Sequence, residues 1–279
     1  MTPTEQSPPI RTALPPDGVE IVRWTCAPAL ADAVTGISGY RELAPGHYRQ
    51  RQPASLVAPI VISFGTPFGI GLGRAPGHND RYGTFAAGLS DRPVIIDSFG
   101  MSHCLQIDFT PAGARRFFCL PMSELANRLA PLDDLLGSQA VEFRDRLGEM
   151  TAWRDRFALV ETLINARLEA SMPAWPGVSW AFRKLLETRG EMRIGTLAER
   201  LDCSRKHLIG KFHEEIGLRP KTVARIIRFS HALTIARSGA EGGWADVAAA
   251  CGYADQAHLS REFRELAGET PSAWRARSA

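Results

Sequence analysis

The chain has 279 residues, 44% hydrophobic and 23% charged, which is an ordinary globular composition at a length that suggests two domains. No apolar run is long enough to cross a bilayer, and the polar, proline-rich start lacks the order of a signal peptide, so we expect no membrane partner. The net charge of +3 is unevenly divided, since residues 181–279 hold 17 Lys and Arg against 12 Asp and Glu. That local balance of +5 favours a polyanionic partner for the second part of the chain.

The five cysteines are widely spaced, odd in number and free of any C-x-x-C pair. This pattern argues against a disulfide framework or a zinc ribbon. It favours free thiols in a reducing compartment, so we expect a cytoplasmic protein. The cysteines are Cys26, Cys104, Cys119, Cys203 and Cys251.

Residues 1–35 are predicted to be a proline-rich tail, and a strand-rich region follows from Gly36 to Phe109. Its short apolar or alternating segments are separated by Gly, Pro, Asp and Asn, which is typical of a β-sandwich or small barrel. The segments are LVAPIVISFG, FGIGLG, YGTFAAGLS, PVIIDSF and HCLQIDF. We assign residues 36–150 to a regulatory domain.

From Pro111 the pattern changes to helical spacing. Helices are predicted in PAGARRFFCL, in MSELANRLAPLDDLLG and in WRDRFALVETLINARLEA, the last with Leu159, Leu163, Ala166 and Ala170 on one face. Residues 151–179 would then be a helix and a linker, because the prolines and glycine of MPAWPGV (172–178) cannot continue a helix.

An internal repeat in the C-terminal region is the most informative feature of the sequence. LAERLDCSRKHLIGKFHEEIGLRP begins at Leu197, and VAAACGYADQAHLSREFRELAGETP begins at Val247. In each copy a short helix ends in a turn, a second helix packs through Leu and Phe four residues apart, and Gly ends it. This is the pattern of a helix-turn-helix unit, predicted at about 194–217 and 244–268. The matched pairs are Ala198 and Ala248, Leu208 and Leu259, Phe212 and Phe263, Gly217 and Gly268, and Pro220 and Pro271; the turns lie near Asp202-Cys203 and Gly252-Tyr253.

Two ordinary helical hairpins are the alternative, but two copies with matched anchors on the basic part of the chain argue against it. The predicted buried residues of the second helices are Leu208, Phe212 and Ile216, and Leu259, Phe263, Leu266 and Ala267. Between the units, residues 221–238 form an amphipathic pattern with Val223, Ile226, Ile227, Ala232 and Ile235 as apolar members. Eighteen helical residues span roughly 27 Å, a length that suits successive major grooves about 34 Å apart.

The stretch from Trp244 to Arg275 resembles the DNA-binding domain of the AraC/XylS family of bacterial transcription activators. It carries the family element G-[FY]-x(4)-[HYF]-[LF]-x-R-x-F-[RK]-x(3)-G-x-[TS]-P. The resemblance implies an α+β protein: a jelly-roll-like sensor domain with following helices, then an all-α domain over 180–279 with seven helices. It implies promoter DNA and RNA polymerase as partners and often a small-molecule effector, and it leaves a homodimer open.

In the second unit the resemblance places Gln256, Ala257, His258, Ser260 and Arg261 toward the major groove. Arg can grip guanine, Gln can pair with adenine, and Ala can pack on a thymine methyl. The periodicity also leaves Arg264 outside the buried stripe. His258 has an alternative interpretation as a partly buried packing residue.

In the first unit the DNA-facing set is Lys206, His207, Ile209 and Gly210, with His213 also facing outward. Gly210 stands where the family usually has Arg and where the second unit has Arg261. A helical Gly costs about 1 kcal/mol relative to Ala, so it could permit close approach of the backbone or mark a unit that reads fewer bases. Three cations are candidates either for phosphate contacts or for structural pairing within the protein: Lys211, Arg225 and Arg228.

Two other functions fit the sequence less well. A metal-dependent jelly-roll enzyme would need clustered His and carboxylate ligands, but His47, His78 and His103 each stand alone, and no G-x-S-x-G occurs. A non-specific architectural protein usually carries denser positive charge or wedge residues. We therefore predict a transcription regulator with no catalytic residue, metal or cofactor.

Overall fold

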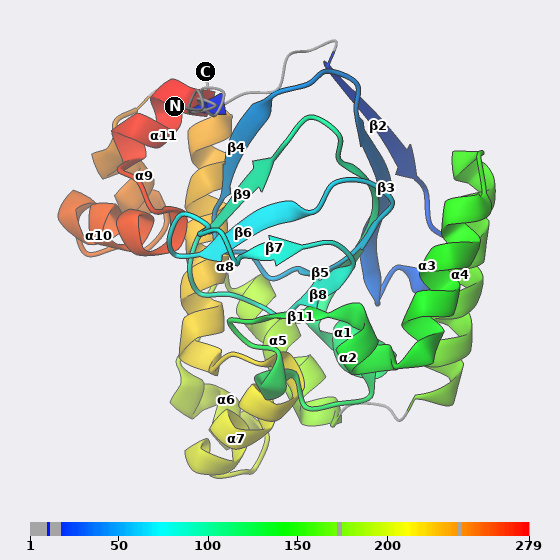
Figure 1. The fold of residues 1–279 in the computed structure, drawn as a ribbon. Coiled ribbons are helices and arrows are strands. Elements are labelled where there is room, and N and C mark those ends of the chain that lie inside the picture. Colours follow the sequence, from blue (N-terminus) through cyan, green and yellow to red (C-terminus); the bar gives the residue numbers. More distant parts are fainter. Residues whose placement is uncertain (1–9, 12–17, 172–174, 239–241, 279) are drawn as a thin grey trace.

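The computed structural model of the protein describes residues 10, 11, 18–171, 175–238 and 242–278. The first part is built from two sheets and the second from helices (Figure 1). The strands are β1 (Ile10–Arg11), β2 (Val19–Trp24), β3 (Val34–Glu42), β4 (His47–Gln52), β5 (Ala58–Ser63), β6 (Phe68–Leu72), β7 (Arg81–Tyr82), β8 (Phe85–Ala87), β9 (Val94–Ser98), β10 (His103–Phe109) and β11 (Leu129–Pro131).

The strand order is that of a jelly roll. One sheet runs β11-β8-β5-β10-β3-β2 and the other runs β1-β4-β9-β6-β7. The eight strands β3 to β10 thus form two antiparallel four-stranded layers, β3-β10-β5-β8 and β4-β9-β6-β7, connected as two Greek keys. The predicted jelly-roll-like domain is confirmed.

Side chains of β10 alternate between two different environments. Leu105, Ile107 and Phe109 are buried and belong to the main core together with residues of the following helices. Cys104, Gln106 and Asp108 face the space between the sheets. The period of two along a strand therefore separates an apolar, helix-covered face from a partly polar interior.

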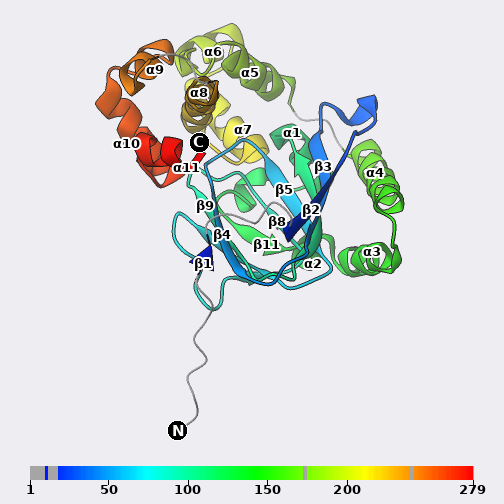
Figure 2. The same cartoon turned by 90° about the horizontal axis from the view of Figure 1, so that it is seen from above.

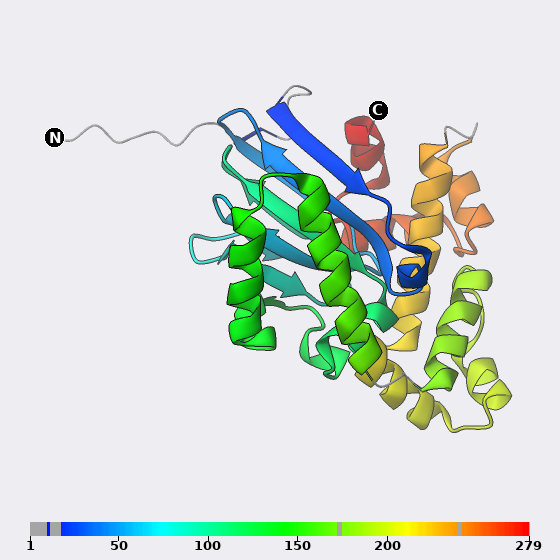
Figure 3. The same ribbon diagram turned by 90° about the vertical axis from the view of Figure 1, so that its right-hand side faces the viewer.

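Helices cover the outer face of the larger sheet, as Figure 3 shows for the two longest of them, α3 and α4. Trp153 at the start of α4 lies over Gly39 on β3, where an added Cβ would come within 2.4 Å of the indole ring. The helices and short 3-10 turns of this part are η2 (Pro28–Leu30), α1 (Pro111–Phe118), η3 (Met122–Glu124), α2 (Leu132–Leu136), α3 (Ser138–Glu149) and α4 (Trp153–Ala170).

The structure corrects four details of the sequence prediction. The tail is shorter than residues 1–35, because β2 and the start of β3 lie within that range. The segment 122–137 is not one helix, since η3, β11 and α2 interrupt it. Helix α4 buries Phe157, Val160, Ile164 and Leu168 rather than the predicted face. Of the predicted linker 172–178, residues 172–174 lie outside the described residues and 176–178 already belong to α5.

Seven helices of the described chain follow the linker and gather around the long α8 (Figure 2). Short α6 and α9 each precede a longer helix, α7 or α10, which gives two helix-turn-helix units joined by α8. The seven are α5 (Pro176–Glu187), α6 (Ile194–Arg200), α7 (Arg205–Ile216), α8 (Pro220–Arg237), α9 (Trp244–Ala250), α10 (Gln256–Ala267) and α11 (Pro271–Ser278).

Candidate nucleic-acid interface

The second helix of each unit begins with a side-chain N-cap and ends with a glycine C-cap. The Ser204 hydroxyl accepts a hydrogen bond from the backbone N–H of His207 at 3.1 Å, and the Asp255 carboxylate accepts one from His258 at 2.6 Å. Both side chains satisfy a backbone donor that the first turn of a helix leaves free. At the other end Gly217 and Gly268 adopt left-handed conformations, with φ of 91° and 70°, and end the helices.

The turns inside the two units are also equivalent. Asp202 has φ of 48° and Gly252 has φ of 68°, so both turns use a left-handed residue at the matched position. Such a turn redirects the chain within a few residues, which sets the angle between the two helices of a unit. The repeat in the sequence is thus a repeat in backbone conformation.

The predicted buried residues are buried. Leu208, Phe212, Leu259 and Phe263 have no measurable exposure, and Ile216, Leu266 and Ala267 are at most 3% exposed. In the second unit Phe263 contacts the rings of Phe229, Trp244 and Trp274, at centroid distances of 5.0, 5.3 and 5.8 Å. This aromatic cluster fixes α10 against α8, α9 and α11.

Burying these residues leaves equivalent positions exposed on the opposite side of each helix. Lys206, Gly210 and His213 on α7 match Ala257, Arg261 and Arg264 on α10, and all six are exposed. Of the flanking positions, Ile209 is 37% exposed and Gln256 is exposed, whereas Ser260 is half-buried. These faces are free to contact a partner.

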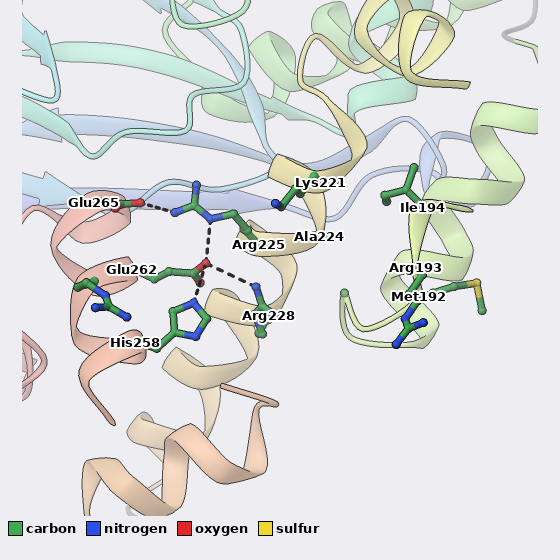
Figure 4. Close-up of a pocket in the computed structure, with 12 residues that line it drawn as sticks. Met192, Arg193, Ile194, Lys221, Ala224, Arg225, Arg228, His258, Glu262 and Glu265 are labelled. Atoms are coloured by element: carbon green, nitrogen blue, oxygen red, sulfur yellow. Dashed lines mark hydrogen bonds and ion pairs between the residues drawn. The ribbon is translucent and has the colours of Figure 1, made fainter. Parts of the chain in front are cut away.

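A buried carboxylate holds α10 to α8. The Glu262 side chain is 5% exposed; its Oε1 atom lies 2.8 Å from Nε of Arg225 and 3.5 Å from Nη2 of Arg228 (Figure 4). Arg225 also pairs with Glu265, and the guanidinium of Arg228 lies over the ring of Tyr253. The two arginines are therefore engaged in ion pairs within the protein, and their contact with phosphate stays a prediction.

His258 takes part in the same cluster. Its ring lies edge-on to Tyr253 at 5.2 Å, and its Nε2 atom is 4.0 Å from Glu262. The side chain is 34% exposed, so it packs against α9–α10 neighbours and keeps one edge accessible. Its placement agrees with the packing interpretation.

Two predicted residues of α7 contact other side chains of the protein. His207 lies edge-on to Trp175 at 5.2 Å, and Lys211 pairs with Glu214 at 2.9 Å. The hydrogen bond with Glu214 raises the pKa of Lys211. Close by, the buried Glu215 carboxylate accepts the backbone N–H of Trp175, and burial raises the pKa of Glu215.

A cavity of about 720 Å³ separates the two units. Figure 4 shows its two walls, Met192 to Ile194 on one side and α8 with α10 on the other. A neighbouring hollow shares Arg193 and Lys221 with it and adds Arg205 and Arg219. The sequence reasoning missed these four cations; the signal available was that Arg193, Arg219 and Lys221 border the starts of two helices.

The recognition-helix candidates contact the jelly-roll domain through their C-terminal ends. On α10, the carbonyl of Gly268 accepts a hydrogen bond from Arg51 at 2.6 Å, and that of Leu266 accepts one from the backbone N–H of Ala54 at 2.7 Å. On α7, Gly217 lies against Met122 of η3. The N-terminal ends, which read bases in helix-turn-helix proteins, lie at the far end of each helix from these contacts.

Among the described residues, no group of three or more His, Cys, Asp and Glu side chains could hold a metal ion. No helix in the same ranges is long and apolar enough to span a membrane. All five cysteines are free thiols.

Comparisons with known proteins bear on the C-terminal part. A family model described as a helix-turn-helix domain matches residues 197–277. No curated protein matches the chain in sequence. The chain is similar to the solved C-terminal domain of AraT, a response regulator from Geobacillus stearothermophilus, at 23% identity, covering 37% of this chain and 85% of that one with a TM-score of 0.34.

Two longer structures are also similar. ToxT from Vibrio cholerae is 12% identical, with 86% of this chain and 97% of that chain covered and a TM-score of 0.46. The AraC-like transcriptional activator CuxR is 18% identical, with 83% and 87% covered and a TM-score of 0.33. With the helices, turns and caps of both units in place, the C-terminal part of this protein is a domain of two helix-turn-helix units.

Proposed function

We propose that the protein binds promoter DNA in a sequence-specific manner, with α7 and α10 in successive major grooves. The observation that carries this proposal is the equivalence of the two units. Both have the same caps and turn and the same buried anchors, and both expose the same helix positions. Helix α8, 18 residues or roughly 27 Å long, joins the two units at a separation that suits one face of B-DNA.

The two units differ in what they offer a base pair. Arg261 on α10 is exposed and suits guanine, with Gln256, Ala257 and Ser260 around it and Arg264 one turn further on. On α7 the matching position is Gly210, between Lys206, Ile209 and His213. We infer that the second unit reads bases more strictly than the first, and that His207 and His258 contribute at the edges of the interface.

The surface cations of the cavity between the units suit the phosphate backbone. Arg193 and Lys221 line it, Arg205 lines the neighbouring hollow, and all three are exposed. Phosphate contacts of this kind fix the register of a protein on DNA without reading sequence. We assign Arg225 and Arg228 to holding α10 rather than to phosphate, and Lys211 to its pair with Glu214.

We further propose that the jelly roll senses a small-molecule effector in the cytoplasm and that the protein activates transcription through RNA polymerase. Support comes from a cavity of about 430 Å³ between the two sheets, within the size range of small-molecule sites.

Selection of genomic fragments by the purified protein tests the proposal. We expect a small set of recurrent sites, bound at least a thousandfold more tightly than random duplex at the same salt concentration. Equal affinity for both would favour an architectural protein instead, and no binding to either would refute the proposal.

A further inference from the structure

The cavity between the sheets has a polar side and an apolar side. Val61 and Phe85 on β5 and β8 and Phe68 and Ile70 on β6 are buried and form its apolar side. Strands β3, β4 and β10 contribute polar side chains to the lining, among them Ser38, Gln50, Gln52, Gln106 and Asp108. Four of these five side chains are half-buried, and Gln52 is exposed; a half-buried polar group is costly unless it finds a hydrogen-bond partner.

Asp108 is the one carboxylate that the described residues contribute to the cavity lining. Its Oδ1 atom accepts a hydrogen bond from the amide of Gln106 at 2.8 Å, and burial raises the pKa of Asp108. The cation of the lining, Arg23, is exposed on the edge strand β2. A carboxylate paired with an amide in a partly buried site attracts a hydrogen-bond donor, most strongly a charged one, and repels an anion.

Strand β4 connects this cavity to the second helix-turn-helix unit. Gln50 and Gln52 line the cavity, whereas Arg51 between them projects from the other face of the strand and donates to the carbonyl of Gly268. Ala54, just past the strand, donates to Leu266. Strand β9, which lines the cavity with Ile96 and Ser98, is preceded by Pro93, whose ring lies against Gly268.

The main contacts of the first unit with the jelly-roll domain lie elsewhere. Helix α7 meets the jelly-roll domain at α1 and η3, neither of which lines the cavity. A change in the position of β4 would therefore reach the C-terminal end of α10 and leave α7 in place.

Building on the effector-sensing role of the jelly roll, we propose that the cavity takes a small primary amine with an apolar body, and that β4 transmits its occupancy to α10. The ammonium group donates to Asp108, and the apolar body lies on Phe68, Ile70 and Phe85. Contacts of the ligand with Gln50 and Gln52 bias the position of Arg51 and, through it, of the second unit.

Three compounds with one skeleton test the ligand class: phenethylamine, phenethyl alcohol and phenylacetate. We expect phenethylamine to raise the thermal unfolding midpoint of the full chain saturably, the alcohol to do so less, and phenylacetate not at all. Asp108→Asn keeps the shape of the side chain and should weaken amine binding roughly tenfold or more. Equal shifts for amine and carboxylate, or an unchanged amine affinity in Asp108→Asn, would overturn the ligand class.

Footprinting on a selected site tests the transmission. Phenethylamine should change protection of the half-site read by α10 and leave the other half-site unchanged. In Arg51→Ala the midpoint shift should persist while the change in protection is lost; Arg144→Ala removes an exposed arginine on α3 and should respond as the wild type does. A wild-type response in Arg51→Ala would overturn the transmission, whereas absence of any DNA binding would refute the proposed function and leave the amine site standing.

Discussion

At the residue scale, Asp202 and Gly252 show the same backbone demand met by different side chains. Both sit at the left-handed position of a helix-turn-helix turn. For a residue with a Cβ this conformation costs about 1–2 kcal/mol, and less for Asp than for most residues. Gly adopts it without steric strain but loses more backbone conformational entropy on folding.

Asp202→Gly should therefore raise the free energy of unfolding, by about 0.5 kcal/mol after the entropy cost. The reverse change at the matched position, Gly252→Asp, should lower it by about 1 kcal/mol. Urea unfolding gives the free energy of unfolding of both variants. If both substitutions changed it in the same direction, the two turns would not be equivalent.

Glu215 predicts a pH dependence of stability. Burial raises its pKa in the folded chain above the unfolded value, so the ionised form opposes folding, and stability is lost as pH rises through the folded pKa. Glu215→Gln should be more stable than wild type at neutral pH, and the difference should shrink below the unfolded pKa of about 4.3. Thermal unfolding from pH 4 to pH 8 measures this; a gap that widened toward acid would show that the sign is wrong.

At the element scale, helix α10 is anchored by Phe263 within the cluster of Phe229, Trp244 and Trp274. Phe263→Ala should cost about 3–5 kcal/mol because it opens a cavity among rings that cannot collapse into it. Phe212→Ala tests the same position in α7, and Lys206→Ala, at an exposed position, is the control. Chemical denaturation gives the values, and near-wild-type stability of Phe263→Ala would mean that α10 packs differently.

The elements that the sequence predicted well are those with a strong local pattern. Leu208, Phe212, Leu259 and Phe263 repeat with helical spacing between recognisable turns, so both units could be located. Strand β2 was missed because Ile21 and Arg23, which alternate with half-buried neighbours on an edge strand, give a weak apolar signal. The segment 122–137 has helical spacing, but β11 forms there by pairing with distant β8, an interaction that local periodicity does not report.

The residues of the candidate site also fall into two groups, those that local spacing predicts and those that depend on contacts between distant segments. Exposure of Arg261 and Gly210 followed from the position of the buried stripe, but the roles of Arg225 and Arg228 depend on Glu262, which lies 37 and 34 residues away. The Trp175–His207 contact and the hydrogen bond from Arg51 to Gly268 likewise join distant segments. Helical periodicity predicts which face is buried, and only the fold decides which neighbour covers the rest.

At the scale of the whole molecule, the two helix-turn-helix units meet the jelly-roll domain differently: α10 through hydrogen bonds at its C-terminal end, and α7 by packing on α1 and η3. Arg51 and Ala54 hold the end of α10, and η3 lies against Gly217. The aromatic cluster around Phe263, which anchors the second unit, lies within the helical domain itself.

Residues 175–279 expressed alone should therefore fold and bind the sites selected by the full chain. Circular dichroism and binding titrations check this expectation. A helical, soluble fragment without affinity for those sites would show that the jelly roll is needed to position the two units.

The two ends of the DNA-binding surface should contribute unequally to recognition. Arg261 is exposed on α10, whereas the matching Gly210 on α7 has no atom within 4 Å of a built Cβ, so neither packing nor crowding in the protein requires a glycine there. Arg261→Ala should cost about 1–3 kcal/mol and relax one base preference if it reads guanine. If the side chain meets only phosphate, binding should weaken on every sequence and the salt slope should fall by about one unit. Gly210→Arg should tighten binding through the added cation, unless the missing side chain lets α7 approach DNA closely. Titrations of both variants at several salt concentrations, on a selected site and on random duplex, separate these outcomes. Unchanged affinity, specificity and salt slope in Arg261→Ala would mean that α10 does not enter the groove.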